Sequence, residues 1–346
     1  MQTISYDYKL ISPLMSYIHL LYSILSGGAE KRGLLQDVFP LEFEPVVDLF
    51  DRHGYGYDCK YAEFIFPKIP KQTNDKAVVV CVSGGKDSLA TAMYYKERDY
   101  DVRLFHLKGI NKCYPDEYKA IENAARYLGL SLCEWEVKLH GNHQYIEHPL
   151  KNWIFMNAAL TYAIREVGTT NVAVGNFQTA YLSDQKFEVS AGDTIEFWHY
   201  YEDIIHMILP DFQVLLPLEN VGETLRAFEG KPELLEISQS CIGTYRFKEY
   251  KGNLVRKKYN YPLLPHRCGS CWKCALEYIY YVEYDMFEMN EEYYKHCLKI
   301  LYNTMKFEND YNEYTVEDVW NNYMLTDSIE NSKLDGILDL NMKGLR

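Results

Sequence analysis

The residues with the clearest chemical pattern are SGGKDS at positions 83–88, which follow the apolar run AVVVCV at 77–82. Glycine lets a backbone pass close to an anion, and the unpaired first N–H groups of a helix favour negative charge. A strand, this loop and a helix in succession therefore predict a phosphate cradle. In such a cradle, serine hydroxyls bond phosphate oxygens, a lysine adds charge, and an aspartate holds Mg²⁺ or a backbone turn. The residues expected to bind the phosphates are Ser83, Gly84, Gly85, Lys86, Asp87 and Ser88.

The loop differs from the Walker A loop of P-loop NTPases. That motif, GxxxxGK[ST], requires glycine where this chain has Val80, and serine or threonine where it has Asp87. The loop therefore belongs to another class of phosphate-binding turn.

A group of cysteines predicts a metal site. Cys268, Cys271 and Cys274 have CxxCxxC spacing, and Cys241 lies upstream in the segment SQSCIG. Three thiolates at this spacing and a fourth from a distant loop form the tetrahedral site that zinc prefers. An iron–sulfur cluster and unligated core thiols remain alternatives, although no further cysteine with a trailing proline follows, as in ferredoxin-type runs. The total of nine cysteines, an odd number, favours a reducing compartment.

The elements that must position these residues follow from the pattern after residue 76. Short β-branched runs alternate there with longer amphipathic segments, which is typical of βα units in a doubly wound parallel sheet. We therefore predict a Rossmann-like α/β fold, with strands at 77–82, 102–106, 131–137, 171–174 and 212–216. The helices expected between them cover 88–98, 117–128, 153–167 and 196–208. Helical additions are expected at 13–25 and 45–52, and at 276–287, 291–305 and 316–324.

Four regions are expected along the chain. They are a helical N-terminal extension at 1–75, a nucleotide-binding α/β domain at 76–236, a Cys₄ zinc module at 237–285 and a helical C-terminal region at 286–346. The first region offers too little chain for a core of its own. We therefore expect it to pack on the α/β domain or at a subunit interface.

The composition is that of a globular protein, since 47% of the residues are hydrophobic and 25% are charged. With 36 basic and 49 acidic residues, the net charge of −13 argues against a broad surface for long nucleic acid. The apolar run at 13–25 is too short to span a membrane and lacks the basic flank of a signal peptide, so we expect a cytoplasmic protein. The basic stretch 246–258 is either a solvated face of the zinc module or a docking patch for an acidic partner.

The loop at 83–88 resembles the SGGxDS motif of the PP-loop ATP pyrophosphatases. Together with the SC…CGxCxxC pattern of the cysteines, it resembles the 7-cyano-7-deazaguanine synthase family over about residues 77–280. Between these two motifs, KN at 151–152 stands where the family has RN, and Gly175 and Asn176 follow the strand predicted at 171–174, where the family's strand ends in glycine. The resemblance therefore adds Lys151, Asn152 and Gly175 to the expected ATP-binding residues.

The resemblance implies an ATP-dependent ligase that forms carbon–nitrogen bonds, with ATP, Mg²⁺ and structural Zn²⁺ bound. In the family, the carboxylate of 7-carboxy-7-deazaguanine attacks the α-phosphate of ATP and pyrophosphate leaves. Ammonia displaces AMP to give an amide, and a second adenylation lets the amide dehydrate to a nitrile. Lys86 and Asp87 are the expected catalytic residues, because charge on the departing pyrophosphate must be stabilised.

Several segments depart from the family and leave the acceptor open. HLKGINKC at 106–113 replaces its YGQ, AGDTIEF at 191–197 replaces its YPDCR, and the loop between the first two metal-site cysteines is longer. One alternative is an antiviral-defence enzyme that joins an activated deazapurine to a protein amine. Others are a PP-loop enzyme of tRNA thiolation or lysidine type and a non-catalytic nucleotide-binding scaffold. The expected partners are a deazapurine, ammonia or a protein amine, a protein partner, and further copies of the chain in a homo-oligomer.

Overall fold

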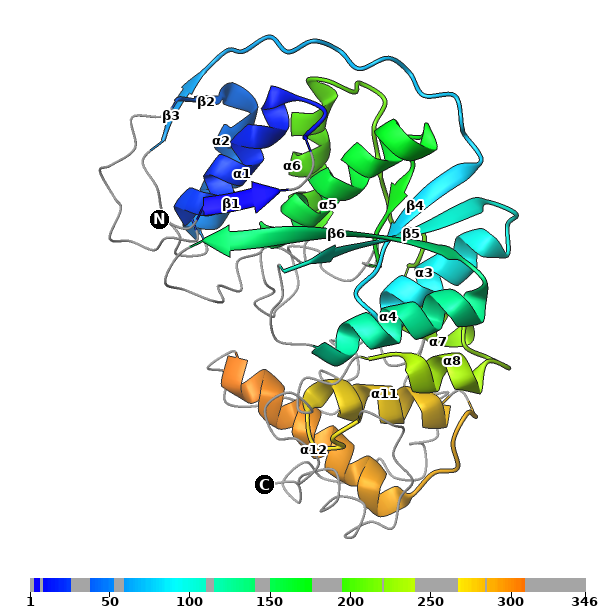
Figure 1. Ribbon diagram of the computed structural model, residues 1–346. Helices are drawn as coiled ribbons and strands as arrows, with labels where there is room; N and C mark the ends of the chain where they lie inside the picture. Colours follow the sequence, from blue (N-terminus) through cyan, green and yellow to red (C-terminus); the bar gives the residue numbers. More distant parts are fainter. Residues whose placement is uncertain are drawn as a thin grey trace.

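A computed structural model of the chain describes ten segments, and their elements form a central sheet covered by helices on both faces (Figure 1). A pair of helices from late in the chain extends one of these helical layers. The described residues are 3–6, 9–25, 38–52, 59–109, 115–140, 150–175, 195–219, 221–239, 267–283 and 285–308.

The central sheet has the strand order β1-β6-β5-β4-β7-β8 within the described residues. Its parallel strands are β4 (Ala77–Cys81), β5 (Asp101–Lys108), β6 (Ser131–His140), β7 (Val172–Ala173) and β8 (Val214–Leu215). The first of these along the chain, β4, lies in the middle, and the later strands are added on either side of it. This is the doubly wound α/β fold that the sequence predicts.

Three short strands were not expected from the sequence. β1 (Thr3–Tyr6) pairs antiparallel with β6 at the edge of the central sheet. β2 (Val38–Pro40) and β3 (Lys60–Ala62) form a separate parallel pair. Strands of three or four residues are too short to show a periodic pattern, so only their pairing partners reveal them.

Both faces of β4 are buried, which explains its uninterrupted apolar sequence. Val78 and Val80 belong to the core on one face, and Val79 and Cys81 to the core on the other. The helices of the first face are α3 (Lys86–Lys96), α4 (Pro115–Leu128), α7 (Val221–Arg226) and α8 (Pro232–Ile237). Those of the second face are α1 (Pro13–Leu25), α2 (Glu44–Phe50), α5 (Lys151–Tyr162) and α6 (Ile195–His206). None of the described helices is both long and apolar enough to cross a membrane.

The N-terminal helices pack on the α/β sheet. Leu14 and Ile18 of α1 share a core with Trp153 of α5. The chain that leads from this region to β4 is also tied to the second face, because the Ile69 N–H donates to the Ile208 carbonyl at 2.8 Å. The N-terminal region was expected to pack on the α/β domain or at a subunit interface, and its described residues pack on the α/β domain.

The C-terminal helices extend the core of the first face. α11 (Trp272–Glu283) and α12 (Glu291–Glu308) pack on each other, and Tyr280 and Leu298 share a core with Leu225 of α7 and Leu234 of α8. α11 is therefore packed against the helices that cover the first face of the sheet. The further helix expected at 316–324 lies outside the described residues.

A buried histidine of α1 should make stability depend on pH. His19 is 7% exposed, and burial lowers its pKa from 6.5 to about 3. Below pH 6.5 the unfolded chain therefore binds a proton that the folded chain does not bind, and stability falls as the pH drops. We expect this residue to cost about 2 kcal/mol of unfolding free energy at pH 5 relative to pH 7. Urea unfolding of the wild type and of His19→Leu at both pH values measures the difference, and an equal loss in both proteins would contradict it.

Candidate functional site

The loop of residues 83–88 joins β4 to α3 at the carboxyl edge of the sheet. From β4 the chain crosses to β5 through α3 on one face, whereas it reaches the neighbouring strand β7 through α5 on the other face. β4 and β7 therefore form the topological switch point, where open α/β sheets bind their ligands. The predicted phosphate cradle lies where this fold places a binding crevice.

The loop is held in shape by its own hydrogen bonds. Gly84 has a positive φ of 74°, which glycine adopts without strain. The Ser88 hydroxyl donates to the Gly85 carbonyl at 3.1 Å and accepts from the Ser83 N–H at 3.4 Å. Gly85 is the N-cap of α3 and provides no side-chain cap, so the N–H groups of the first turn are available to an anion. Ser88 is buried and braces the loop, whereas Ser83 is exposed and can meet a phosphate.

Lys86 and Asp87 place opposite charges on the first turn of α3. Lys86 Nζ lies 2.7 Å from Asp87 Oδ1, and the two side chains are 10% and 33% exposed. Thr91 Oγ1 donates to the Asp87 carbonyl at 3.0 Å and so fixes the turn. The carboxylate keeps a solvent-facing side on which a cation can bind, and the ammonium group lies beside it.

The other predicted nucleotide-binding residues reach the same edge of the sheet. A Cβ atom added to Gly175, just after β7, would lie 2.5 Å from the Ser88 backbone nitrogen and 2.7 Å from the Asp87 carbonyl carbon. The structure therefore brings Gly175 into contact with the loop, at a position that accepts no side chain. Lys151 and Asn152 occupy the first turn of α5 and are half-buried. Because α5 follows the parallel strand β6, its first turn lies at the carboxyl edge of the sheet, as the loop does.

His106 is a buried residue beside the loop that sequence analysis leaves without a role. Its Nδ1 lies 2.8 Å from the carbonyl oxygen of Val82, and since a carbonyl only accepts, Nδ1 carries the proton. Burial is the main cause of its lowered pKa, so the ring is neutral and Nε2 is an acceptor. Nε2 has no hydrogen-bond partner among the described residues. No sequence motif indicates that His106 lies beside the loop, because its contact with the Val82 carbonyl depends on the pairing of β4 with β5.

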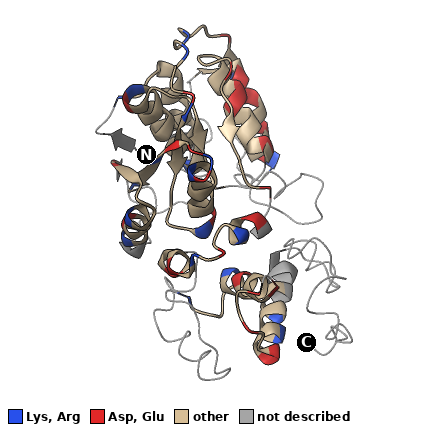
Figure 2. Cartoon of the chain, turned by 90° about the vertical axis from the view of Figure 1, so that its right-hand side faces the viewer, with Lys and Arg blue, Asp and Glu red and all other residues tan. Residues whose placement is uncertain are grey.

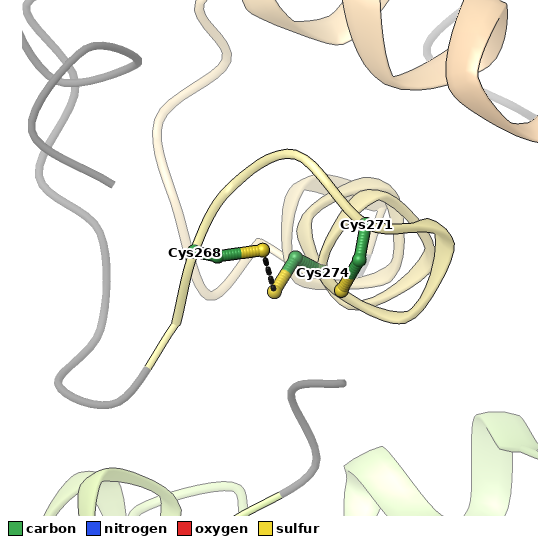
Figure 3. A group of neighbouring side chains, drawn as sticks. All are labelled: Cys268, Cys271 and Cys274. Carbon is green, nitrogen blue, oxygen red and sulfur yellow. Dashed lines mark hydrogen bonds between the residues drawn. The ribbon is translucent and has the colours of Figure 1, made fainter. Parts of the chain in front are cut away.

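The three cysteines of the CxxCxxC motif converge at the start of α11 (Figure 3). The Sγ atoms of Cys268, Cys271 and Cys274 lie within 4.8 Å of one another, and those of Cys268 and Cys274 are 3.9 Å apart. Tetrahedral zinc with Zn–S bonds of about 2.3 Å separates its sulfurs by about 3.8 Å, so these thiols fit one metal ion such as zinc. The Ser270 N–H also donates to Cys268 Sγ at 3.4 Å. Cys241, the expected fourth ligand, lies outside the described residues.

Charge on the described surface is mixed in sign. Figure 2 shows Lys and Arg residues interspersed with Asp and Glu over the helices and loops. The basic stretch 246–258 lies outside the described residues. In the described part of the chain, the expected nucleotide-binding residues that carry positive charge are Lys86 in the first turn of α3 and Lys151 in the first turn of α5.

These features define a Rossmann-like α/β protein with an SGGKDS loop at its switch point and a cysteine cluster able to hold a metal ion. No protein-family model matches the sequence, and no curated protein matches it either. The chain is similar to a solved structure from Methanocaldococcus jannaschii, described as the predicted subunit of tRNA methyltransferase. The two share 20% identity over 45% of this chain and 74% of that chain, with a TM-score of 0.29. At this TM-score, the similarity carries no argument about function.

Proposed function

We propose that the chain is an ATP-dependent enzyme that adenylates a carboxylate and releases pyrophosphate. The observation that supports this most is the loop of residues 83–88, which lies at the switch point with a helix N-terminus open to an anion. Lys86 and Asp87 lie on the first turn of that helix. The resemblance to the PP-loop ATP pyrophosphatases assigns the cleaved bond to the one between the α- and β-phosphates.

In this proposal the chain binds and orients ATP, and the substrate carboxylate is the nucleophile. N–H groups at the start of α3 hold the β- and γ-phosphates, and the Lys86 ammonium group offsets negative charge as pyrophosphate leaves. The exposed side of the Asp87 carboxylate holds Mg²⁺, which neutralises phosphate charge when it is bound. No serine, cysteine or histidine nucleophile is required.

The proposed substrate is 7-carboxy-7-deazaguanine, on the basis of the sequence resemblance. A carboxylate oxygen bonds to the α-phosphorus, the bond to the bridging oxygen breaks, and pyrophosphate takes the electron pair. Ammonia then adds to the acyl carbon, and AMP and a proton leave to give the amide. The amide oxygen then bonds to the α-phosphorus of a second ATP, and a second pyrophosphate leaves with the electron pair of the broken bond. Loss of AMP, which takes the former amide oxygen, and of two protons gives the nitrile.

A protein amine is the second candidate acceptor. It uses the same acyl-adenylate and replaces ammonia in the second step only. The sequence features that favour it are the departure from the family's YPDCR at residues 191–197 and the longer loop between Cys241 and Cys268. The family's YGQ is also replaced, at residues 106–113, and His106 at the start of that segment is buried with its Nδ1 2.8 Å from the Val82 carbonyl oxygen.

Mass spectrometry of the product formed from 7-carboxy-7-deazaguanine, ATP, Mg²⁺ and ammonia tests the proposal. Conversion to the amide or the nitrile supports the ligase reaction with ammonia. Consumption of ATP only when a protein acceptor is added supports conjugation. Recovery of the unchanged acid, with no ATP consumed under either condition, would show that the proposed function is wrong.

Gly175→Ala should damage the cradle from the side of β7. The added methyl group would meet the backbone of Ser88 and Asp87, and overpacking of this kind costs about 1–3 kcal/mol. Because the shift displaces the N–H groups at the start of α3, we expect ATP affinity to fall by roughly tenfold or more. Calorimetric titration with ATP measures it.

Gly129→Ala is the matched control for this substitution. Gly129 has a φ of 64° and no atom within 4 Å of an added Cβ, so the variant pays about 1 kcal/mol of backbone strain away from the loop. Its ATP affinity should equal that of the wild type. Equal ATP affinities of the wild type, Gly175→Ala and Gly129→Ala would show that Gly175 is not part of the nucleotide site.

A further inference from the structure

A buried ion pair lies between the cysteine cluster and the loop of residues 83–88. Arg267 directly precedes Cys268, and its side chain and that of Glu277 in α11 are each 3% exposed. Arg267 Nε donates to Glu277 Oε2 at 2.5 Å, and Nη2 donates to Oε1 at 3.3 Å. Glu277 follows Cys274 by less than one turn of helix, so both members of the pair are attached to the metal-site cysteines.

The same guanidinium group holds the residue that follows α8. Arg267 Nη1 donates to the Ser238 carbonyl at 2.7 Å, and Nη2 lies 3.1 Å from the Ser238 hydroxyl oxygen, which accepts from it. That hydroxyl in turn donates to the Leu235 carbonyl at 2.8 Å. Ser238 is completely buried, so its position is fixed by these contacts.

The next residue contacts the loop itself. The Gln239 N–H donates to the Gly84 carbonyl at 2.7 Å, and Gly84 is the residue whose positive φ shapes the loop. A continuous path therefore runs from Cys268 through Arg267, Ser238 and Gln239 to Gly84. Every step in this path is a covalent neighbour or a hydrogen bond of ordinary length.

Stability alone is a poor explanation for this arrangement. A buried ion pair is often no more stabilising than two apolar side chains of similar volume, because both charges lose their hydration. What an apolar pair does not provide is the set of directed hydrogen bonds to Ser238. The guanidinium group of Arg267 therefore fixes the position of Ser238, which packing in the core alone would not do.

We propose that Arg267, oriented by Glu277, is a positioning residue that couples the cysteine cluster to the phosphate loop. Metal bound at the cysteines fixes the backbone that carries Arg267, and Arg267 fixes the Gly84 carbonyl through Ser238 and Gln239. Zinc therefore raises the affinity for ATP, and by thermodynamic linkage ATP raises the affinity for zinc by the same factor. The inference rests on the proposed function in one respect, which is that ATP is the ligand of the loop.

The test compares the full-length zinc-loaded protein with the double variant Arg267→Met/Glu277→Leu. These apolar side chains keep the pair's approximate volume and leave no buried charge behind. We expect ATP affinity, measured calorimetrically with Mg²⁺, to fall by roughly tenfold or more, since charge-assisted hydrogen bonds are lost. Zinc affinity, measured by competition with a chelator, should rise on ATP addition in the wild type and no longer do so in the variant.

Tyr294→Phe is the control within the same helical pair. It removes the hydrogen bond from the Tyr294 hydroxyl to Glu283 Oε1 at 2.6 Å, which does not touch Ser238. It should leave ATP affinity and the zinc response unchanged. Where the double variant fails to fold, Ser238→Ala removes the hydroxyl that accepts from Arg267 and donates to the Leu235 carbonyl, and it should weaken both quantities in the same direction.

The outcomes separate this inference from the proposed function. Suppose that the wild type binds ATP, that the double variant or Ser238→Ala binds it equally well, and that ATP still raises the zinc affinity of the variant. The coupling is then overturned, and the proposed function stands. If the wild type binds no ATP, the proposed function fails and the coupling to ATP fails with it. Loss of coupling with zinc still bound supports the inference.

Discussion

Asp87→Asn should lower the rate of AMP formation by about a thousandfold or more, with little change in stability. The Asp87 carboxylate is 33% exposed and pairs with Lys86, and it belongs to neither apolar core. Asparagine keeps the size of the side chain and the backbone carbonyl that accepts from Thr91. It removes the charge proposed to hold Mg²⁺, so the chemistry and not the fold should suffer. AMP release at saturating ATP and Mg²⁺ measures the effect, and urea unfolding checks the fold.

Asp101→Asn is the matched control. Asp101 also pairs with a cation, Arg103 at 2.8 Å, but at the exposed start of β5. Its loss removes a surface ion pair that contributes at most about 1 kcal/mol, and AMP formation should be unchanged. If Asp87→Asn turns over as fast as Asp101→Asn, the loop has no part in the reaction.

Cys271→Ser should remove the metal ion and much of the cooperative folding of the module around α11. Structural zinc contributes on the order of 10 kcal/mol of apparent binding free energy in zinc-finger peptides. A serine hydroxyl does not replace a thiolate ligand, and the remaining Sγ atoms of Cys268 and Cys274 would have to hold the ion with fewer protein ligands. Elemental analysis should find one zinc per wild-type chain and none in the variant. The thermal unfolding midpoint should fall accordingly.

Cys133→Ser is the control for the metal site. Cys133 lies in β6, and burial, together with the nearby charges of Glu166 and Glu134, raises the pKa of its thiol to about 11. Cys133 is not among the three cysteines whose Sγ atoms converge, so its loss should leave the zinc content unchanged. Iron and labile sulfide in the wild type would contradict the zinc assignment.

The elements around the site could be predicted where their sequence pattern is long. β4 is an uninterrupted apolar run because both faces of the sheet centre are buried, and its expected position, 77–82, agrees with the structure to within one residue. β5 was expected at 102–106 and extends from Asp101 to Lys108. α3 begins at Lys86 rather than at the expected residue 88, since the second half of the SGGKDS motif already forms its first turn. β7 has two residues where four were expected. Residues of a short strand can be apolar without all pairing in the sheet.

In the candidate site, too, features formed by neighbouring residues in the sequence could be predicted, whereas contacts between distant segments could not. The SGGKDS loop and the CxxCxxC motif are encoded in consecutive residues, so their positions could be read from the sequence. Gly175 was predicted from the family resemblance alone, and the structure shows that it lies against the backbone of Ser88. The contacts of Arg267 and His106 could not be predicted, because each side chain donates to a backbone carbonyl that the fold brings from elsewhere in the chain.

The most direct test of the proposed adenylation is to determine which bond of ATP is cleaved. ATP labelled separately at the α- and γ-phosphates is incubated with the protein, Mg²⁺, 7-carboxy-7-deazaguanine and ammonia or a protein acceptor, and the labelled products are separated. Adenylation at the loop of residues 83–88 predicts the α label in AMP and the γ label in pyrophosphate. The α label in ADP and the γ label in inorganic phosphate would contradict it.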